Sequence, residues 1–343
     1  MKRFTETRFG IRDLSKPKHW NANTLDFCID KPTFINLGGN GTICDSQANG
    51  RCSRVERMMG LKAKAKDISS TYNDVNIISF IYGRDNESDK VGKFTAQEIC
   101  FYVYTLLLPL FTNEEGERLS LDDACKNFSK IVFYSHCYGS VALNELMSQL
   151  NKILLELGYS KDELLTIYSH SIHITYSPLQ ADSWLPCVAV NSFSDSFNQA
   201  SDMRVWFKRT YGYDLNGVAL DYGDKYFCKH LINKKECHKT ISIYTSRLLN
   251  TEDNTGSKII DEHASDYLDL DYSWSACERS KGAKNSECVS KLVGYALSWA
   301  GARAIQVEKG DKNIDFKLED LKHALEDVLN AYNENDLRYE EGL

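Results

Sequence analysis

A thiol stands between a predicted strand and a predicted helix near the middle of the chain. The run Lys130 to Ser135 (KIVFYS) is β-branched and aromatic, as is typical of a buried strand, and Val141 to Leu157 has the pattern of a helix. Between them the chain reads Ser135-His136-Cys137-Tyr138-Gly139. A thiol becomes a nucleophilic thiolate near neutral pH only with a base or a positive neighbour. The chemistry to look for is therefore nucleophilic attack by a Cys137 thiolate, helped by a base or a positive neighbour elsewhere in the chain.

The five residues around Cys137 resemble the nucleophile elbow, G-x-S-x-G, of the α/β-hydrolase superfamily. Small residues stand two positions before and two after that nucleophile, because strand and helix backbones crowd together at a strained turn. Here Ser135 takes the first small position and Gly139 the last. Cysteine in the middle is similar to the minority of members, such as dienelactone hydrolase, that use a thiol, and the sequence leaves open whether it replaces a natural serine. The resemblance spans roughly Pro32 to His263 and implies a lipase- or esterase-like enzyme for an acyl ester, thioester or lipid substrate, with no cofactor and no metal.

The resemblance also implies an acid after a later strand, which holds the histidine in the tautomer that faces sulfur. Asp195 follows the strand-like run Cys187 to Asn191 (CVAVN) and is the preferred candidate. Asp221 and Asp224 are rivals in the loop-rich stretch beyond it, and Asp261 is a weaker one. Aspartate also commonly caps helices, so Asp195 has that second use if a helix begins shortly after it.

The histidine implied by the resemblance lies beyond the last strand. His263 follows the run Thr240 to Thr245 (TISIYT), whereas the other histidines fit the order or the loop position less well. His263 would take the thiol proton, and Asp195 would stabilise the charged imidazole. A thioester then forms on Cys137, and water activated by His263 hydrolyses it. The alternative is an ordinary surface histidine and a cysteine that acts as a small buried hydrophobe.

Two backbone donors for a tetrahedral oxyanion are expected from the same resemblance. One is the N–H of Tyr138, the residue after the nucleophile. The other falls on Gly39 or Asn40 in the loop Leu37 to Gly41 (LGGNG), which is similar to the family's H-G-x-x-G loop but has leucine where histidine is common. Glycine-rich turns after a strand also cradle phosphates, yet this one lacks the Gly-Lys-Ser/Thr ending and the G-x-G-x-x-G pattern. A Ser-Pro step at Ser177, which lipase-like members often carry, is a further likeness.

Strand-like runs alternate with helical segments along the chain. This alternation predicts an α/β fold with a mainly parallel central sheet and helices on both faces. The apolar run Ile99 to Phe111 is shorter than the roughly 20 residues that cross a bilayer, so it indicates a buried helix. Two more helices are expected in the tail, over Cys288 to Ala304 and Asp315 to Tyr332. The strand-like runs are Pro32 to Leu37, Val75 to Tyr82, Lys130 to Ser135, Ser171 to Tyr176, Cys187 to Asn191 and Thr240 to Thr245.

No internal repeat and no glycine/serine linker divides the chain, so one domain is predicted. Residues 32–287 are expected to form the hydrolase-like domain, with an insertion at about 196–238, and residues 288–343 to add helices packed on it. Residues 1–31 form an N-terminal segment without an assigned role. Substrate identity and oligomeric state do not follow from these patterns.

Charge and cysteine usage argue against several classes of protein. With 41 lysines and arginines against 48 aspartates and glutamates, the net charge of −7 repels a phosphate backbone, so no nucleic-acid partner is expected. The start of the chain has no uninterrupted apolar stretch, so we expect no signal peptide and no membrane span. The protein is then expected to be cytoplasmic as synthesised, and export by a signal-independent route stays open. The 11 cysteines are odd in number and lack C-x-x-C spacing, which favours reduced thiols over disulfides or a zinc site.

Two other classes of function stay open. A catalytically silent hydrolase fold can serve as a binding or interaction protein, and cysteine in place of serine, together with Leu37 in the oxyanion loop, motivates that hypothesis. A Cys-dependent acyltransferase or peptidase is the other, since cysteine before histidine is also the papain-like order. In papain-like proteins the nucleophile begins a helix without a preceding parallel strand, so the place of Lys130 to Ser135 in the fold discriminates between these architectures.

Overall fold

The structure is a computed structural model of the chain. It describes the core strands, the helices that pack on them and the last long helix. The described residues are 4–10, 32–38, 75–81, 96–176, 178–179, 183–192, 218–221, 240–245 and 318–340, together with isolated positions between 292 and 306.

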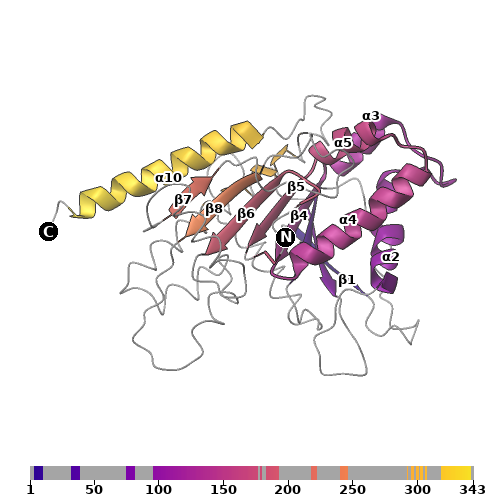
Figure 1. The fold of residues 1–343 in the computed structure, drawn as a ribbon, viewed down its shortest axis with the longest axis horizontal. Helices are drawn as coiled ribbons and strands as arrows, with labels where there is room; N and C mark the ends of the chain where they lie inside the picture. Colours follow the sequence, from indigo (N-terminus) through magenta and orange to yellow (C-terminus); the bar gives the residue numbers. More distant parts are fainter. Residues whose placement is uncertain are drawn as a thin grey trace, which may run out of the picture.

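Eight described strands form one sheet in the order β1-β3-β2-β4-β5-β6-β8-β7 (Figure 1). Each neighbouring pair is parallel except β7 and β8, which are antiparallel. The predicted α/β fold with a mainly parallel sheet is therefore confirmed. The strands are β1 (Phe4–Gly10), β2 (Thr33–Leu37), β3 (Val75–Ile81), β4 (Ile131–His136), β5 (Ile172–Tyr176), β6 (Cys187–Ser192), β7 (Val218–Asp221) and β8 (Thr240–Thr245).

The central strands are buried on both faces, which is why they appear in the sequence as continuous apolar runs. Every residue of β2 and β4 is buried, the polar Asn36 and Ser135 included. β1 and β7 were not among the predicted strands. β1 (FTETRFG) carries charged residues within the N-terminal segment, and β7 is four residues long within the predicted insertion at 196–238. Both lie at the ends of the strand order, where short or polar strands are common.

The described helices include those that the sequence predicts. The predicted buried helix at Ile99 to Phe111 is present as α2, followed by the π-helical segment η3 and the 3-10 segment η4, which contains Pro109. The predicted helix after Cys137 is α4, the last predicted helix is α10, and the described positions between 292 and 306 are helical. Among the described helices, none combines the length and the apolar character that crossing a bilayer requires. The helical elements are α2 (Ala96–Tyr102), η3 (Val103–Leu107), η4 (Leu108–Leu110), α3 (Leu121–Phe128), α4 (Gly139–Glu156), α5 (Lys161–Ser169) and α10 (Leu318–Glu340).

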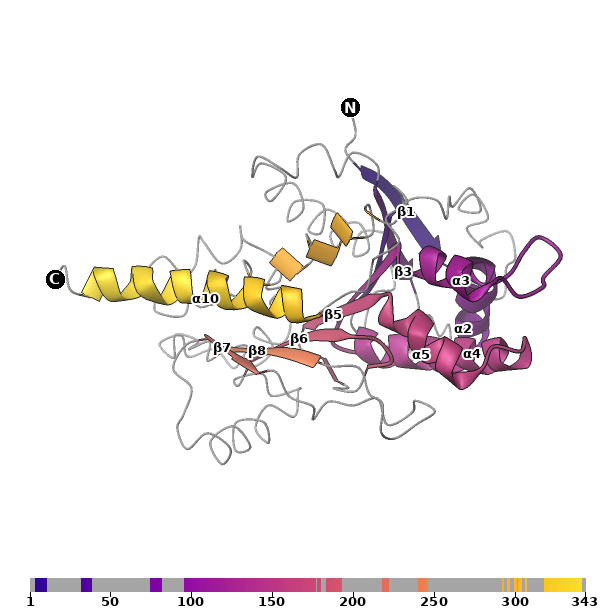
Figure 2. The ribbon, with the colours of Figure 1, turned by 90° about the horizontal axis from the view of Figure 1, so that it is seen from above.

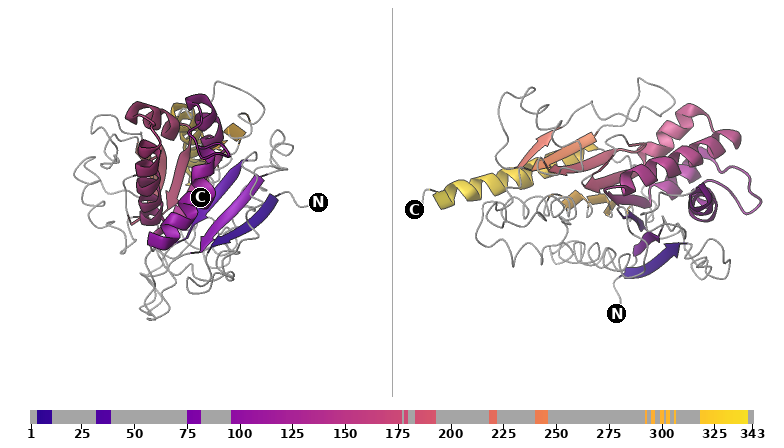
Figure 3. Two further views of the ribbon diagram at one scale, coloured as in Figure 1. Left: turned by 90° about the vertical axis from the view of Figure 1, so that its right-hand side faces the viewer. Right: turned by 60° about the horizontal axis from the view of Figure 1, so that its bottom comes forward.

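Helices lie on both sides of the sheet (Figure 2). α2, α3, α4 and α5 lie on one face, and α10 runs beside β6, β8 and β7 on the other. In α4 the buried residues Leu143, Leu146 and Leu150 recur every three or four positions, so one side of this helix packs into the core. α10 buries Leu321 and Leu325, and its C-terminal end projects past β7 (Figure 3). The first turn of α4 comes directly after β4, and this junction positions Cys137.

Candidate active site

Cys137 lies in a sharp turn between β4 and α4. β4 ends at His136, and α4 begins at Gly139. Cys137 has a φ of 52° and is the only non-glycine residue with positive φ among those that the structure describes. The left-handed region costs an ordinary side chain roughly 1–2 kcal/mol, so the surrounding packing must hold the turn in this conformation. Such strain is concentrated at functional sites in proteins.

Gly139 is the residue that lets the helix start this close to the sheet. A Cβ at position 139 would lie 2.8 Å from the carbonyl oxygen of Gly38 and 2.9 Å from the carbonyl carbon of Leu37, and closer still to the Leu37 oxygen. β2 and β4 are parallel neighbours, with Leu37 paired to Ser135. The end of β2 therefore touches the first residue of α4. This close approach explains the small residue two positions after Cys137.

The carbonyl group of Cys137 is held from two sides. The Ser140 hydroxyl donates to this oxygen at 2.8 Å, and the Ser140 backbone N–H donates at 3.2 Å. From the segment after β5, the backbone N–H of Leu179 donates to the same oxygen at 3.3 Å. Cys137 is buried, with 7% of the residue exposed, and it lies just beyond the carboxyl end of β4.

A buried polar network connects β4 to its neighbour β5. The Ser135 hydroxyl lies 2.7 Å from Nε2 of His173 on β5 and donates to the Thr175 hydroxyl at 2.8 Å. Nδ1 of His173 lies 3.0 Å from the Ser183 hydroxyl and 3.8 Å from Sγ of Cys187. Burial lowers the pKa of His173 to about 3 and raises the pKa of Cys187 to about 12. Both groups are therefore neutral near pH 7, and the network fixes the strands rather than exchanging protons.

The two histidines three positions apart, at 170 and 173, have separate environments. His173 is buried in the network, whereas His170 ends α5, where its Nδ1 lies 2.8 Å from the Thr166 carbonyl oxygen. Both histidines are engaged in hydrogen-bonding contacts, on separate elements of the fold. Within the described part of the chain, no three His, Cys, Asp or Glu side chains gather so that they could hold a metal ion.

Of the predicted site residues, the structure describes Cys137 and Tyr138. Tyr138 is half-buried, has helical φ and ψ, and stands directly before α4. The candidate acid Asp195, the candidate base His263 and the candidate oxyanion residues Gly39 and Asn40 lie outside the described residues. The rivals Asp224 and Asp261 lie outside them as well.

The rival acid Asp221 is described, and its position argues against a catalytic role. Asp221 is the last residue of β7 and pairs with Ser242, three residues before β8 ends at Thr245. β7 is four strand positions away from β4 in the sheet. At a spacing of about 4.8 Å between neighbouring strands, β4 and β7 lie roughly 19 Å apart. Asp221 therefore lies too far from Cys137 to share a hydrogen-bonded site with it.

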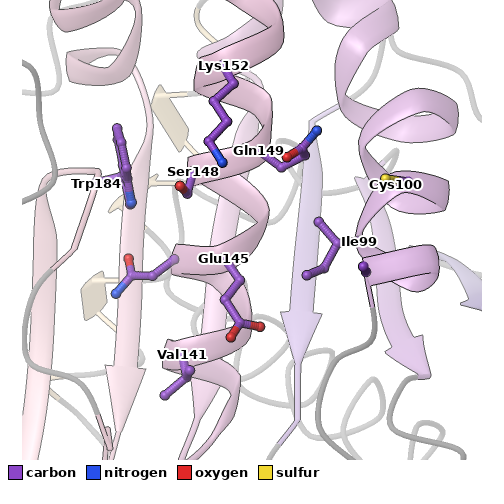
Figure 4. A pocket seen from close by; sticks show the side chains of 10 residues that line it. Ile99, Cys100, Val141, Glu145, Ser148, Gln149, Lys152 and Trp184 are labelled. Atoms are coloured by element: carbon purple, nitrogen blue, oxygen red, sulfur yellow. The ribbon is translucent and has the colours of Figure 1, made fainter.

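A separate groove of about 460 Å³ lies along the outer side of α4 (Figure 4). Val141, Glu145, Ser148 and Lys152 follow one another along the helix, with Trp184 on one side and α2 on the other. Cys137 and Tyr138 are not among the lining residues. The groove is thus distinct from the turn that carries the thiol.

No protein-family model matches the chain, and no curated protein matches it.

Sequence reasoning gave no role to the network or to Leu179. Ser135 was assigned to a small position before the nucleophile, and its contact with His173 depends on the pairing of β4 with β5, which no local pattern encodes. The Ser-Pro likeness drew attention to the segment after β5, but the hydrogen bond from Leu179 to Cys137 follows only from the fold.

Proposed function

We propose that the protein is an α/β-hydrolase-like enzyme that hydrolyses an acyl ester, thioester or lipid through Cys137. The observation that carries the proposal is the turn itself. Cys137 adopts a positive φ between a buried parallel strand and a helix, and Gly139 packs against the backbone of Leu37. A strained strand-to-helix turn of this kind presents a nucleophile at the end of the sheet in α/β-hydrolases.

The direction of the strands supports Asp195 as the acid. β4, β5 and β6 are parallel, so their carboxyl ends meet at one edge of the sheet. Cys137 follows β4 by one residue, and Asp195 follows the end of β6 at Ser192 by three residues, which span at most about 10 Å. β6 is two strands from β4, or about 10 Å. The chain therefore leaves β4 and β6 at the same edge of the sheet, and these short segments are compatible with Cys137 and Asp195 sharing one histidine.

His263 is the candidate base on the basis of chain order and length. β8 is parallel to β6 and ends at Thr245, at the edge where Cys137 lies. The 18 positions from Thr245 to His263 are ample to return to that edge. In this arrangement Asp195 orients the imidazole of His263, and the imidazole takes the proton of the Cys137 thiol.

The reaction proceeds through a thioester. Sγ of Cys137 forms a bond to the acyl carbon, the carbonyl oxygen becomes an oxyanion, and the bond to the leaving alcohol or thiol breaks as His263 returns its proton to that group. Water activated by His263 then attacks the thioester, which releases the acid and the free thiol. The N–H of Tyr138 at the start of α4, and an N–H of Gly39 or Asn40 directly after Gly38, are the donors that stabilise the oxyanion.

The place of β4 favours this architecture over a papain-like one. β4 lies inside the sheet, between β2 and β5. In a papain-like protein the nucleophile starts a helix with no parallel strand before it, whereas Cys137 comes at the end of one. An acyltransferase would form the same thioester on Cys137. It would differ only in the second step, where another acceptor takes the acyl group in place of water.

Ester hydrolysis by a small set of variants tests the proposal. With p-nitrophenyl butyrate, we expect Cys137→Ala and His263→Ala each to lower kcat/KM at least about 1000-fold, and Asp195→Asn to lower it about 100-fold or more. Cys100→Ser is the matched control, since Cys100 is an exposed cysteine on α2 and should leave kcat/KM unchanged. Full hydrolysis by Cys137→Ala would refute the proposal. Absence of turnover with every acyl ester in the wild type would favour the silent binding protein instead.

A further inference from the structure

Leu179 is an exposed apolar side chain directly beside the nucleophile turn. Among the described residues, Tyr104 at 55% and Leu179 at 39% are the large hydrophobic side chains that stay exposed. A single exposed leucine on a protein surface is ordinary. The position of Leu179 is what distinguishes it, because its backbone N–H donates to the carbonyl oxygen of Cys137 at 3.3 Å.

This hydrogen bond fixes the backbone of Leu179 relative to the carbonyl group of Cys137. The preceding Pro178 is buried, and β5, which leads into this segment, pairs with β4 so that Tyr176 is opposite His136. The backbone of Leu179 is therefore anchored at both the strand and the turn. Tyr104, in contrast, belongs to η3, which packs with α2 and α4 away from this contact.

We infer that Leu179 contributes an apolar contact for the acyl chain that Cys137 receives, so that the enzyme prefers medium-length alkyl acyl groups over acetyl or charged ones. The inference rests on the proposed function and names its substrate class. A rigidly held apolar group next to a nucleophile removes part of an alkyl chain from water as the acyl carbon reaches sulfur. Burial of one methylene is worth about a fourfold change in affinity or rate, so a few methylenes give a measurable preference.

Labelling of Cys137 by two maleimides tests the inference without requiring turnover. Peptide mapping gives the second-order rate constants for the reaction of Cys137 with N-hexylmaleimide and with N-ethylmaleimide. The hexyl-to-ethyl ratio for Cys137 is then divided by the hexyl-to-ethyl ratio for glutathione, which corrects for the intrinsic reactivity of the two reagents. In the wild type we expect a preference of at least about fivefold for the hexyl reagent. In Leu179→Ser the preference should fall to nearly one, while Leu179→Met, which stays apolar and of similar volume, should keep it.

Tyr104→Ser is the control, because it removes the other exposed large hydrophobic side chain and should keep the hexyl preference. A preference that is unchanged in Leu179→Ser, or absent in the wild type, would overturn the inference. A thermal melt of each variant checks that Leu179→Ser is folded. If it is not, Leu179→Gln measured against Leu179→Met decides the same question.

The acyl-chain series separates this inference from the proposed function. p-Nitrophenyl acetate, butyrate and octanoate are compared in the wild type and in Leu179→Ser. Hydrolysis with the same chain-length preference in both proteins would overturn the role of Leu179 and leave the enzyme intact. Leu179-dependent labelling of Cys137 without hydrolysis of any ester would support the apolar contact and refute the proposed function.

Discussion

The first residue of α4, Gly139, lies against the peptide group that joins Leu37 to Gly38 at the end of β2. This contact joins two segments about one hundred positions apart in the sequence. It brings the end of β2, at Leu37 and Gly38, next to the turn that holds Cys137. Because α4 starts beside the backbone of β2, the chain has little room between strand and helix, and Cys137 takes up the sharp reversal with a φ of 52°.

Gly139→Ala should destabilise the fold strongly. The added Cβ would clash with backbone atoms of Leu37 and Gly38, which cannot move aside as the end of a side chain can. We expect the free energy of unfolding to fall by about 2–3 kcal/mol in urea denaturation. Gly116→Ala is the control, since position 116 has a φ of 82° but open space, and should lose only about 1 kcal/mol. An equal loss in the two variants would contradict the close approach.

The strain at Cys137 should be visible in the stability of two variants at this position. Cys137→Gly should be more stable than Cys137→Ala by about 1 kcal/mol, because glycine adopts positive φ at little cost. At Glu145, an exposed position inside α4, the order should reverse, with glycine about 1 kcal/mol less stable than alanine. Urea denaturation of the four proteins measures both differences. Alanine more stable than glycine at position 137 would show that the turn is not strained.

Sequence reasoning predicted the elements better than their contacts. The central strands and α4 are long apolar or periodic segments, so local pattern is enough to find them. β1 and β7 are edge strands, and their charged or short sequences owe their strand conformation to pairing with β3 and β8. At the candidate site the spacing around Cys137 predicted a turn. The reasons for that spacing are contacts between distant segments, which no single sequence pattern displays. Gly139 lies against Leu37, and Ser135 contacts His173.

The buried His173 should make stability depend on pH in acid. Burial lowers its pKa in the folded protein to about 3, against about 6.5 in the unfolded chain, so between these values the unfolded state binds more protons. Stability from this residue is therefore present above about pH 6.5 and is lost as the pH falls. We expect the wild type to lose about 2 kcal/mol from His173 between pH 7 and pH 5, in urea denaturation at each pH.

Two variants isolate that contribution. His173→Gln should be less stable than the wild type at pH 7 by about 1–3 kcal/mol, and the gap should narrow by about 2 kcal/mol at pH 5 because the titrating group is gone. Ser183→Ala removes a hydrogen bond to His173 but keeps the imidazole, so it should lower stability at pH 7 while retaining the acid dependence. If the difference in free energy of unfolding between the wild type and His173→Gln were the same at pH 7 and pH 5, it would contradict a neutral, buried histidine.

Activation of the Cys137 thiol by His263 is tested by the rate at which iodoacetamide alkylates Cys137 as a function of pH. The rate is measured in the wild type and in His263→Ala, with the label located by peptide mapping. An ordinary thiol, with a pKa of about 8.5, is almost wholly protonated at pH 6. We expect Cys137 to react at pH 6 at least about tenfold faster than the exposed Cys100, and His263→Ala to remove this advantage. A Cys137 that reacts more slowly than Cys100 at pH 6, or that keeps its rate in His263→Ala, would contradict activation of the thiol by His263.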